Sequence, residues 1–165
     1  MKKTLFLTLI FSNLIFSQSI DFEGFMNFSY TNNSGKIHLE VNNLDKEFLY
    51  INSLSRGIGN NDLGLDRGQL GNTRIVFFTK RGNKILMVQP NTRYVSNSDN
   101  YLENKAVEEA FARSVLFSFE IIEEKNNNYI IDLAPLLISD AHGVAQRLKY
   151  SNSGNYSLNK SMSAI

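Results

Sequence analysis

The chain has 165 residues, which is enough for one domain of ordinary size. It contains no cysteine, so disulfides, thiolate zinc sites and a cysteine nucleophile are excluded. Lysine and arginine total 17 against 16 acidic residues, and this formal charge of +1 gives no reason to expect nucleic-acid binding. With only two histidines, His38 and His142, the chain cannot build a three-histidine metal site by itself.

Residues 1–17 are predicted to be a secretory signal peptide. A basic start precedes an apolar stretch at residues 5–16, which is too short to span a bilayer as a helix. Small residues follow, so cleavage is expected after Ser17 or after Ser19. The leader carries two of the basic residues and no acidic one, so its removal changes the formal charge from +1 to −1. We therefore expect an exported protein, periplasmic or extracellular, with no transmembrane span after cleavage.

Residues 18–165 are predicted to form a single α+β domain, mostly antiparallel β-sheet with hairpins and two short helices. Apolar residues alternate over residues 21–30 and again over 36–41, which indicates two strands. Residues 31–35 between them favour a turn, so this region predicts a β-hairpin. His38 lies on the opposite face of its strand from the apolar residues, and we expect it to be exposed.

The middle of the chain predicts strands on both sides of a glycine-rich segment. Residues 48–54 are expected to form a buried strand, and residues 57–71 contain five of the ten glycines. This glycine density predicts a long loop or a tightly turned segment. Residues 73–79 and 84–89 predict a second hairpin, and residues 92–95 are compatible with a short further strand.

Both predicted helices lie in the C-terminal half. Residues 100–113 begin with a capping asparagine and repeat apolar residues at helical spacing. Residues 115–122 and 129–133 predict a third hairpin, and residues 141–148 a second, shorter helix. The tail at residues 155–158 is compatible with one more strand.

The glycine-rich segment matches neither a dinucleotide-binding nor a P-loop pattern, so nucleotide binding is not predicted. Its Asn60, Asn61, Asp62 and Asp66 offer oxygen ligands of the kind that calcium prefers, although their spacing is not that of an EF-hand. The alternative is that these side chains form local turns with the backbone. The turn interpretation is favoured, and calcium binding stays open.

Asp140 and His142 form a second candidate constellation. A carboxylate two residues from a histidine is compatible with an oriented general base. The favoured interpretation is that Asp140 caps the following helix and His142 lies in its first turn. No Gly-x-Ser-x-Gly or His-Glu-x-x-His pattern is present, so no catalytic or metal-binding residue is assigned.

Five segments in order carry a family resemblance: residues 48–54, 57–71, 88–94, 106–116 and 140–145. They are similar to the N-terminal domain of unknown function of large secreted bacterial zinc-dependent metalloproteases. The resemblance implies a later, metzincin-like domain that binds zinc and carries the chemistry. None of its zinc ligands has a counterpart here, so no cofactor is assigned to this chain, which is expected to be inactive alone. The family's first domain continues past the position of Ile165, so the chain is expected to be a fragment.

The leading hypothesis is therefore a non-catalytic, scaffold or prodomain-like module of an exported zinc-dependent metallopeptidase. Its expected partner is the C-terminal metallopeptidase domain of the same polypeptide. The candidate interdomain contact residues are Asn61, Asp62, Asp66, Arg67, Gln69, Asp140 and His142. The alternative is an independent exported β-rich module that binds glycan or peptide through surface aromatics, with Tyr94, Tyr101 and Tyr129 as candidates.

Overall fold

The computed structural model describes residues 19–165. The predicted signal peptide at residues 1–17 lies outside the described residues. Ser19, the residue before the alternative cleavage point, is the first residue described. The strands are β1 (Ser19–Phe22), β2 (Phe28–Thr31), β3 (Lys36–Val41), β4 (Phe48–Tyr50), β5 (Arg74–Arg81), β6 (Lys84–Gln89), β7 (Ser114–Lys125) and β8 (Asn128–Asp132). The α-helices of this part of the chain are α1 (Tyr101–Ala110), α2 (Ala134–Leu137) and α3 (Val144–Tyr150). Two 3₁₀ turns, η1 (Asn61–Leu63) and η2 (Lys160–Met162), complete the elements.

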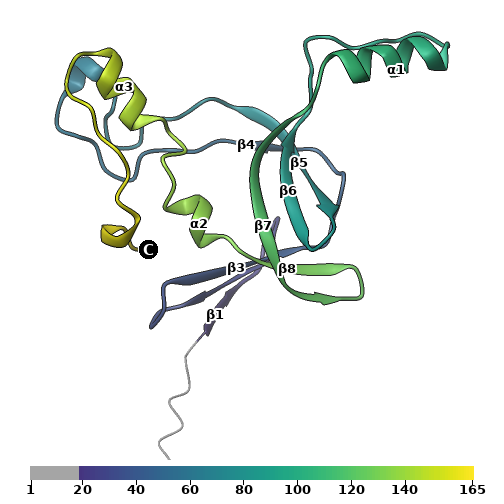
Figure 1. The fold of residues 1–165 in the computed structure, drawn as a ribbon. Helices are drawn as coiled ribbons and strands as arrows, with labels where there is room; N and C mark the ends of the chain where they lie inside the picture. Colours follow the sequence, from purple (N-terminus) through teal and green to yellow (C-terminus); the bar gives the residue numbers. More distant parts are fainter. Residues whose placement is uncertain (1–18) are drawn as a thin grey trace, which may run out of the picture.

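The eight strands form one antiparallel sheet in the order β1-β2-β3-β8-β7-β6-β5-β4, curled into a half-barrel (Figure 1). The N-terminal strands β1, β2 and β3 join the other five strands through the pairing of β3 with β8. In this pair Leu39 lies opposite Ile131. Register shifts in the β6–β7 and β7–β8 pairs mark bulges, and bulges bend a strand and increase its twist. The predicted α+β class with a mostly antiparallel sheet is confirmed.

The three predicted hairpins are present as β2–β3, β5–β6 and β7–β8. Their turns use residues that accept a left-handed backbone: Gly82 has φ 60°, and Asn126 and Asn127 have φ 52° and 63°. The predicted first strand, residues 21–30, is divided into β1 and β2, which pair with each other. The strands suggested at residues 92–95 and 155–158 are not formed.

Two burial predictions were wrong. Residues 48–54 were expected to be a buried strand, but β4 is short and lies at the edge of the sheet, with Leu49 73% exposed. His38 was expected to be exposed, but it is half-buried because β2 and β8 flank its strand on both sides. In both cases the position of the strand within the sheet decides the burial.

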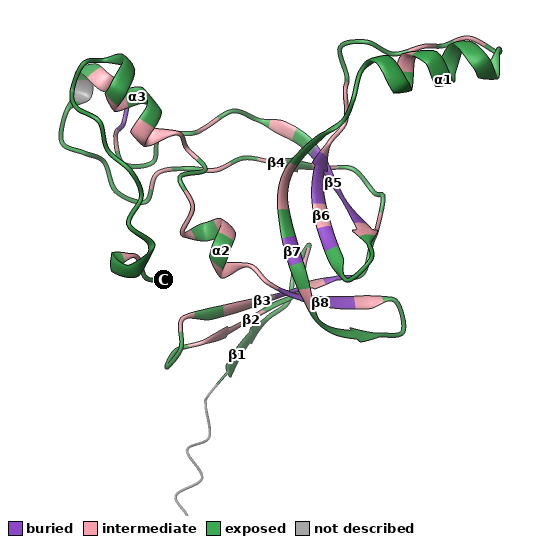
Figure 2. Ribbon diagram, viewed as in Figure 1, coloured by how far each residue is buried: buried purple, intermediate pink, exposed green. Residues whose placement is uncertain are grey.

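The core lies on one face of the sheet. Alternate residues of five strands meet there, as the spacing of two for a half-buried strand requires. The cluster consists of Leu39, Val41, Val76, Phe78, Ile85, Met87, Phe119, Tyr129 and Ile131. In Figure 2 the buried positions gather in the middle of the sheet, while the helices are half-buried or exposed.

The described part of the chain has three short α-helices rather than the predicted two. The predicted α1 is present, and the side chain of Asn100 accepts a hydrogen bond from the Leu102 amide at 2.9 Å. The additional helix, α2, is a single turn with Pro135 at its start, too short to produce a helical repeat in the sequence. No helix of residues 19–165 is long and apolar enough to cross a membrane.

Candidate functional site

The glycine-rich segment folds back on the chain that precedes it and prolongs the β4–β5 pair. The Gly71 amide donates to the Asn52 carbonyl at 2.8 Å, and the Leu54 amide donates to the Gln69 carbonyl at 3.0 Å. Ser53 and Leu70 form an antiparallel bridge between these two contacts. The segment is therefore a hydrogen-bonded excursion from the edge of the sheet.

Close packing explains why glycine occurs at two positions of this excursion, against backbone at Gly57 and against the Asn52 side chain at Gly71. A side-chain carbon at Gly57 would lie 2.8 Å from the Arg67 amide nitrogen, closer than real contacts allow. A side-chain carbon at Gly71 would lie 2.4 Å from Oδ1 of Asn52. Leu65, which is fully buried, gives the excursion an apolar anchor of its own outside the main core cluster.

Asp140 was predicted to be the N-cap residue of the second helix, but α3 starts later than expected and its N-cap residue is Gly143. Asp140, three residues earlier, still binds the first turn through its side chain. Its carboxylate oxygens accept hydrogen bonds from the Val144 amide at 2.8 Å and the Ala145 amide at 3.0 Å. Gly143, with φ 73°, turns the chain into the helix. His142 therefore precedes the helix, whereas the sequence placed it in the first turn.

Two contacts bring the glycine-rich excursion and the Asp140–His142 corner together. Asn52 Nδ2 lies 3.1 Å from Nδ1 of His142, and Arg147 of α3 donates to the Leu63 carbonyl at 3.0 Å. In the Asn52–His142 contact the side-chain NH₂ of Asn52 faces Nδ1 of the imidazole. In Figure 1 the loop that carries η1 lies beside α3. Neither Asn52 nor Arg147 was a candidate site residue from the sequence, because neither stands in a recognisable functional motif.

The seven candidate contact residues lie on these two neighbouring segments. Asp62, Arg67, Gln69 and Asp140 are exposed, Asp66 and His142 are half-buried, and Asn61 is the first residue of η1. The Asp62 amide donates to the Asn60 side chain at 3.0 Å, a local turn of the kind that the favoured interpretation of these residues requires. Among residues 19–165, no group of three or more histidine, aspartate and glutamate side chains is placed to hold a metal ion.

A hollow of about 570 Å³ lies between the base of the excursion and the segment that carries α2 and α3. Its polar lining includes Asn52, Asp140 and His142, and much of the rest is aliphatic. Tyr50 enters it from β4. Burial raises the pKa of the Tyr50 hydroxyl above its ordinary value, while the Arg74 guanidinium acts in the opposite direction. The tyrosine therefore faces the hollow as a neutral phenol.

The three tyrosines suggested for glycan or peptide binding do not form a surface row. Tyr129 is a core residue and is only 5% exposed. Tyr101 is exposed on α1, and Tyr94 stacks on Phe111 with ring centroids 4.2 Å apart. Tyr129 was predicted to lie on the return strand of a hairpin, but the face on which it lies was decided by the pairing of β8 with β3 and β7.

Comparison with known proteins identifies one family. Its model, described as a domain of unknown function (DUF5117), matches residues 68–165, which is more than half of the chain. The matched region includes α1, the Asp140–His142 corner and the end of the glycine-rich excursion. No curated protein and no solved structure matches the chain. The chain therefore belongs to the DUF5117 family of domains of unknown function.

Proposed function

We propose that this chain is a non-catalytic module that packs against another domain of an exported zinc-dependent metallopeptidase. The contact would use the loop–corner face, which we define as the exposed surface of residues 49–71 and 136–158. In this proposal the zinc ligands and the chemistry belong to the catalytic domain, and no residue of this chain is assigned to the metal. The peptidase part of the proposal is supported by the sequence resemblance of the five segments alone.

The observation that carries the docking proposal is the amount of apolar side chain exposed on this face. Its large exposed apolar residues are Leu49, Ile51, Ile58, Leu70, Leu137, Tyr150, Tyr156 and Leu158. Large contiguous apolar patches on a protein surface mark interaction sites, because each square ångström removed from water contributes about 25 cal/mol. Four of these residues line the 570 Å³ hollow, namely Ile51, Leu137, Tyr156 and Leu158, so a partner that inserts a side chain there would cover them as well.

Polar groups on the same face are suited to orient a partner. The Asn52–His142 contact joins the two segments of the face, and Arg67 and Gln69 are exposed on the glycine-rich excursion. Interfaces of this composition combine an apolar centre with a polar rim. This supports a specific protein contact over a catalytic site.

The test is co-expression of this chain with the catalytic domain, with capture of the complex and a peptidase assay. We expect the double variant Asp66→Ala/Arg67→Ala and, separately, Leu70→Ser to weaken association by roughly tenfold or more. Leu102→Ser, an equally exposed leucine on α1, and Asp99→Ala/Lys125→Ala are the matched controls and should associate normally. Unchanged association and activity in both test variants would refute the proposal.

A further inference from the structure

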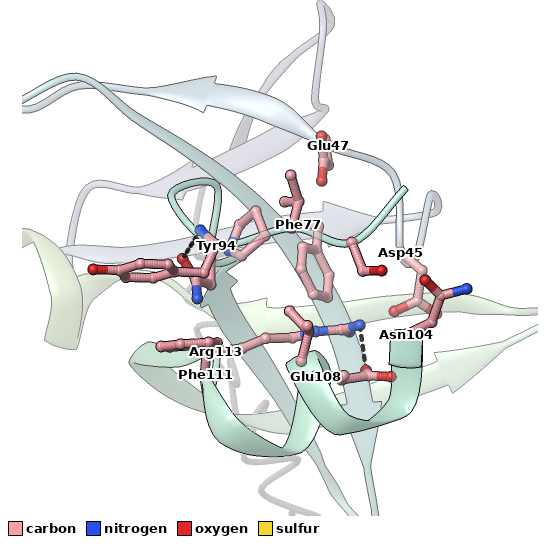
Figure 3. A pocket seen from close by; sticks show the side chains of 13 residues that line it. Asp45, Glu47, Phe77, Tyr94, Asn104, Glu108, Phe111 and Arg113 are labelled. Atoms are coloured by element: carbon pink, nitrogen blue, oxygen red, sulfur yellow. Dashed lines mark hydrogen bonds and ion pairs between the residues drawn. The ribbon is translucent and has the colours of Figure 1, made fainter. Parts of the chain in front are cut away.

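A second hollow, of about 500 Å³, lies between α1 and the sheet, well separated from α3 (Figures 1 and 3). Phe77 of β5 contributes an aromatic ring to it, and Tyr94 stacked on Phe111 contributes two more. The ring planes of Tyr94 and Phe111 are inclined by only 13°. The Asn91 side chain accepts hydrogen bonds from the amides of Arg93 and Tyr94, which fixes the turn that presents Tyr94.

The helix beside this hollow is left without a tertiary partner on most of its surface. None of the residues of α1 is buried, and Leu102 is 69% exposed although it belongs to the apolar stripe. A ten-residue helix is marginal in isolation and normally depends on packing of its apolar face. The exposed Leu102, Tyr94 and Val95 extend the apolar surface beyond the hollow itself. A small molecule bound in the hollow would leave this additional apolar surface uncovered.

Acidic side chains outnumber basic ones among the residues that line the hollow. Arg93 does not line it, although its guanidinium lies 5.5 Å from the ring centroid of Tyr94. Arg113 crosses the hollow with its guanidinium 2.7 Å from the Glu108 carboxylate and above the ring of Phe77, so this positive charge is already paired (Figure 3). Asp45 and Glu47 also line the hollow, and neither forms an ion pair within residues 19–165. Lys46 lies between them in the chain but lines a neighbouring hollow instead.

We propose that this hollow, together with α1, binds a segment of another protein in which Lys or Arg stands beside an aliphatic or aromatic residue. The apolar side chain would lie against Phe77 and Tyr94, and the basic side chain would pair with Asp45 and Glu47. Acidic groups that border an apolar groove favour a basic partner because the unpaired carboxylates repel acidic segments and attract cations. The surface is separate from the loop–corner face, so this inference does not depend on the proposed function.

The test uses the full chain and a fluorescein-labelled peptide of three Lys-Leu-Gly-Ser repeats, measured by fluorescence anisotropy at low ionic strength. The double variant Asp45→Asn/Glu47→Gln removes the two carboxylates that are proposed to pair with lysine. It should weaken binding roughly 3- to 30-fold. The matched control Asp62→Asn/Glu123→Gln removes the same charge from exposed carboxylates that lie outside α1 and do not line the hollow, and it should bind normally. Tyr94→Ala should also weaken binding, whereas Tyr150→Ala, which changes an exposed tyrosine outside both α1 and the hollow, should not.

Circular dichroism of each variant separates loss of binding from loss of fold. Equal affinity for the peptide of three Glu-Leu-Gly-Ser repeats, or equal losses in test and control variants, would overturn the proposal. So would concentration-dependent self-association of the chain that Tyr94→Ala abolishes, because the occupant of the hollow would then be a second copy. The proposal is supported only if Asp45→Asn/Glu47→Gln and Tyr94→Ala both bind the lysine peptide more weakly while their control variants bind it normally.

Discussion

Single-atom contacts determine how the loop–corner face is assembled. Asn52 uses its backbone carbonyl to accept from Gly71 and its side chain to contact His142, so one residue connects three segments. The absence of a side chain at Gly71 is what leaves room for the Asn52 side chain. A change at either position should therefore affect the orientation of His142.

We predict that Gly71→Ala lowers the free energy of unfolding by about 1–3 kcal/mol, because the new methyl group would lie 2.4 Å from Oδ1 of Asn52. Urea denaturation measures the change. Gly24→Ala is the matched control, since no atom lies within 4 Å of the corresponding position and its stability should stay within about 0.5 kcal/mol of wild type. In an Asn52→Ala background the Gly71→Ala penalty should shrink. An unchanged penalty there would show that the clash is not with the Asn52 side chain.

At the scale of secondary structure, the helices of this domain depend on their ends more than on packing. Asn100 caps α1 and the Asp140 side chain binds the first turn of α3, while neither helix contains a buried residue. The side-chain oxygens of Asn100 and Asp140 accept hydrogen bonds from backbone amides in the first turn of each helix. These amides have no carbonyl partner within the helix. The corner that carries His142 is therefore held in place by the cap of α3 and by the Arg147–Leu63 contact.

We predict that Asp140→Ala frays the start of α3 and costs about 0.5–2 kcal/mol of stability, the usual range for loss of a cap. Hydrogen exchange of the Val144 and Ala145 amides should accelerate, because these two groups lose their acceptors. Asp99→Ala, an exposed aspartate outside any helix, should leave both exchange rates unchanged. Protection of the two amides that survives Asp140→Ala would contradict the role of Asp140 at the start of α3.

The molecule as a whole depends on the pairing of β3 with β8, which joins the N-terminal strands to the rest of the sheet. Ile131 lies at this junction, opposite Leu39 on one side and Ile121 on the other, and it is fully buried. Each half of the sheet contributes side chains to the same core cluster. The half-barrel should therefore unfold as one unit.

We predict that Ile131→Ala lowers the free energy of unfolding by about 2–5 kcal/mol, because it leaves a cavity in this shared core. Ile122→Ala, on an exposed position of β7, should cost less than about 1 kcal/mol. Thermal unfolding followed by circular dichroism and by tyrosine fluorescence compares the two variants. Separate transitions for the two probes in Ile131→Ala would mean that the halves of the sheet unfold independently.

Much of the architecture follows from local patterns in the sequence. Alternating apolar residues predict the β2–β3 hairpin and β7, and continuous apolar runs predict β5 and β6. The turn residues between the paired segments explain why the strands reverse there. The cap at Asn100 could be predicted because a cap acts within a few residues of its own position. Asp140 was correctly expected to bind the start of α3, but the N-cap residue there is Gly143. The single-turn α2 could not be predicted, since one turn leaves no repeat to detect.

What the sequence by itself determined is the class of fold, its hairpins and the two segments that meet in the loop–corner face. Only the tertiary structure decided that β3 pairs with β8, that β4 lies at an exposed edge, and that α1 keeps its apolar stripe uncovered. It also placed Asn52 against His142, 90 residues apart in the chain. An apolar pattern indicates which face of a helix or strand is apolar. Which part of the chain packs on that face depends on contacts between residues far apart in the sequence, and local patterns do not reveal those contacts.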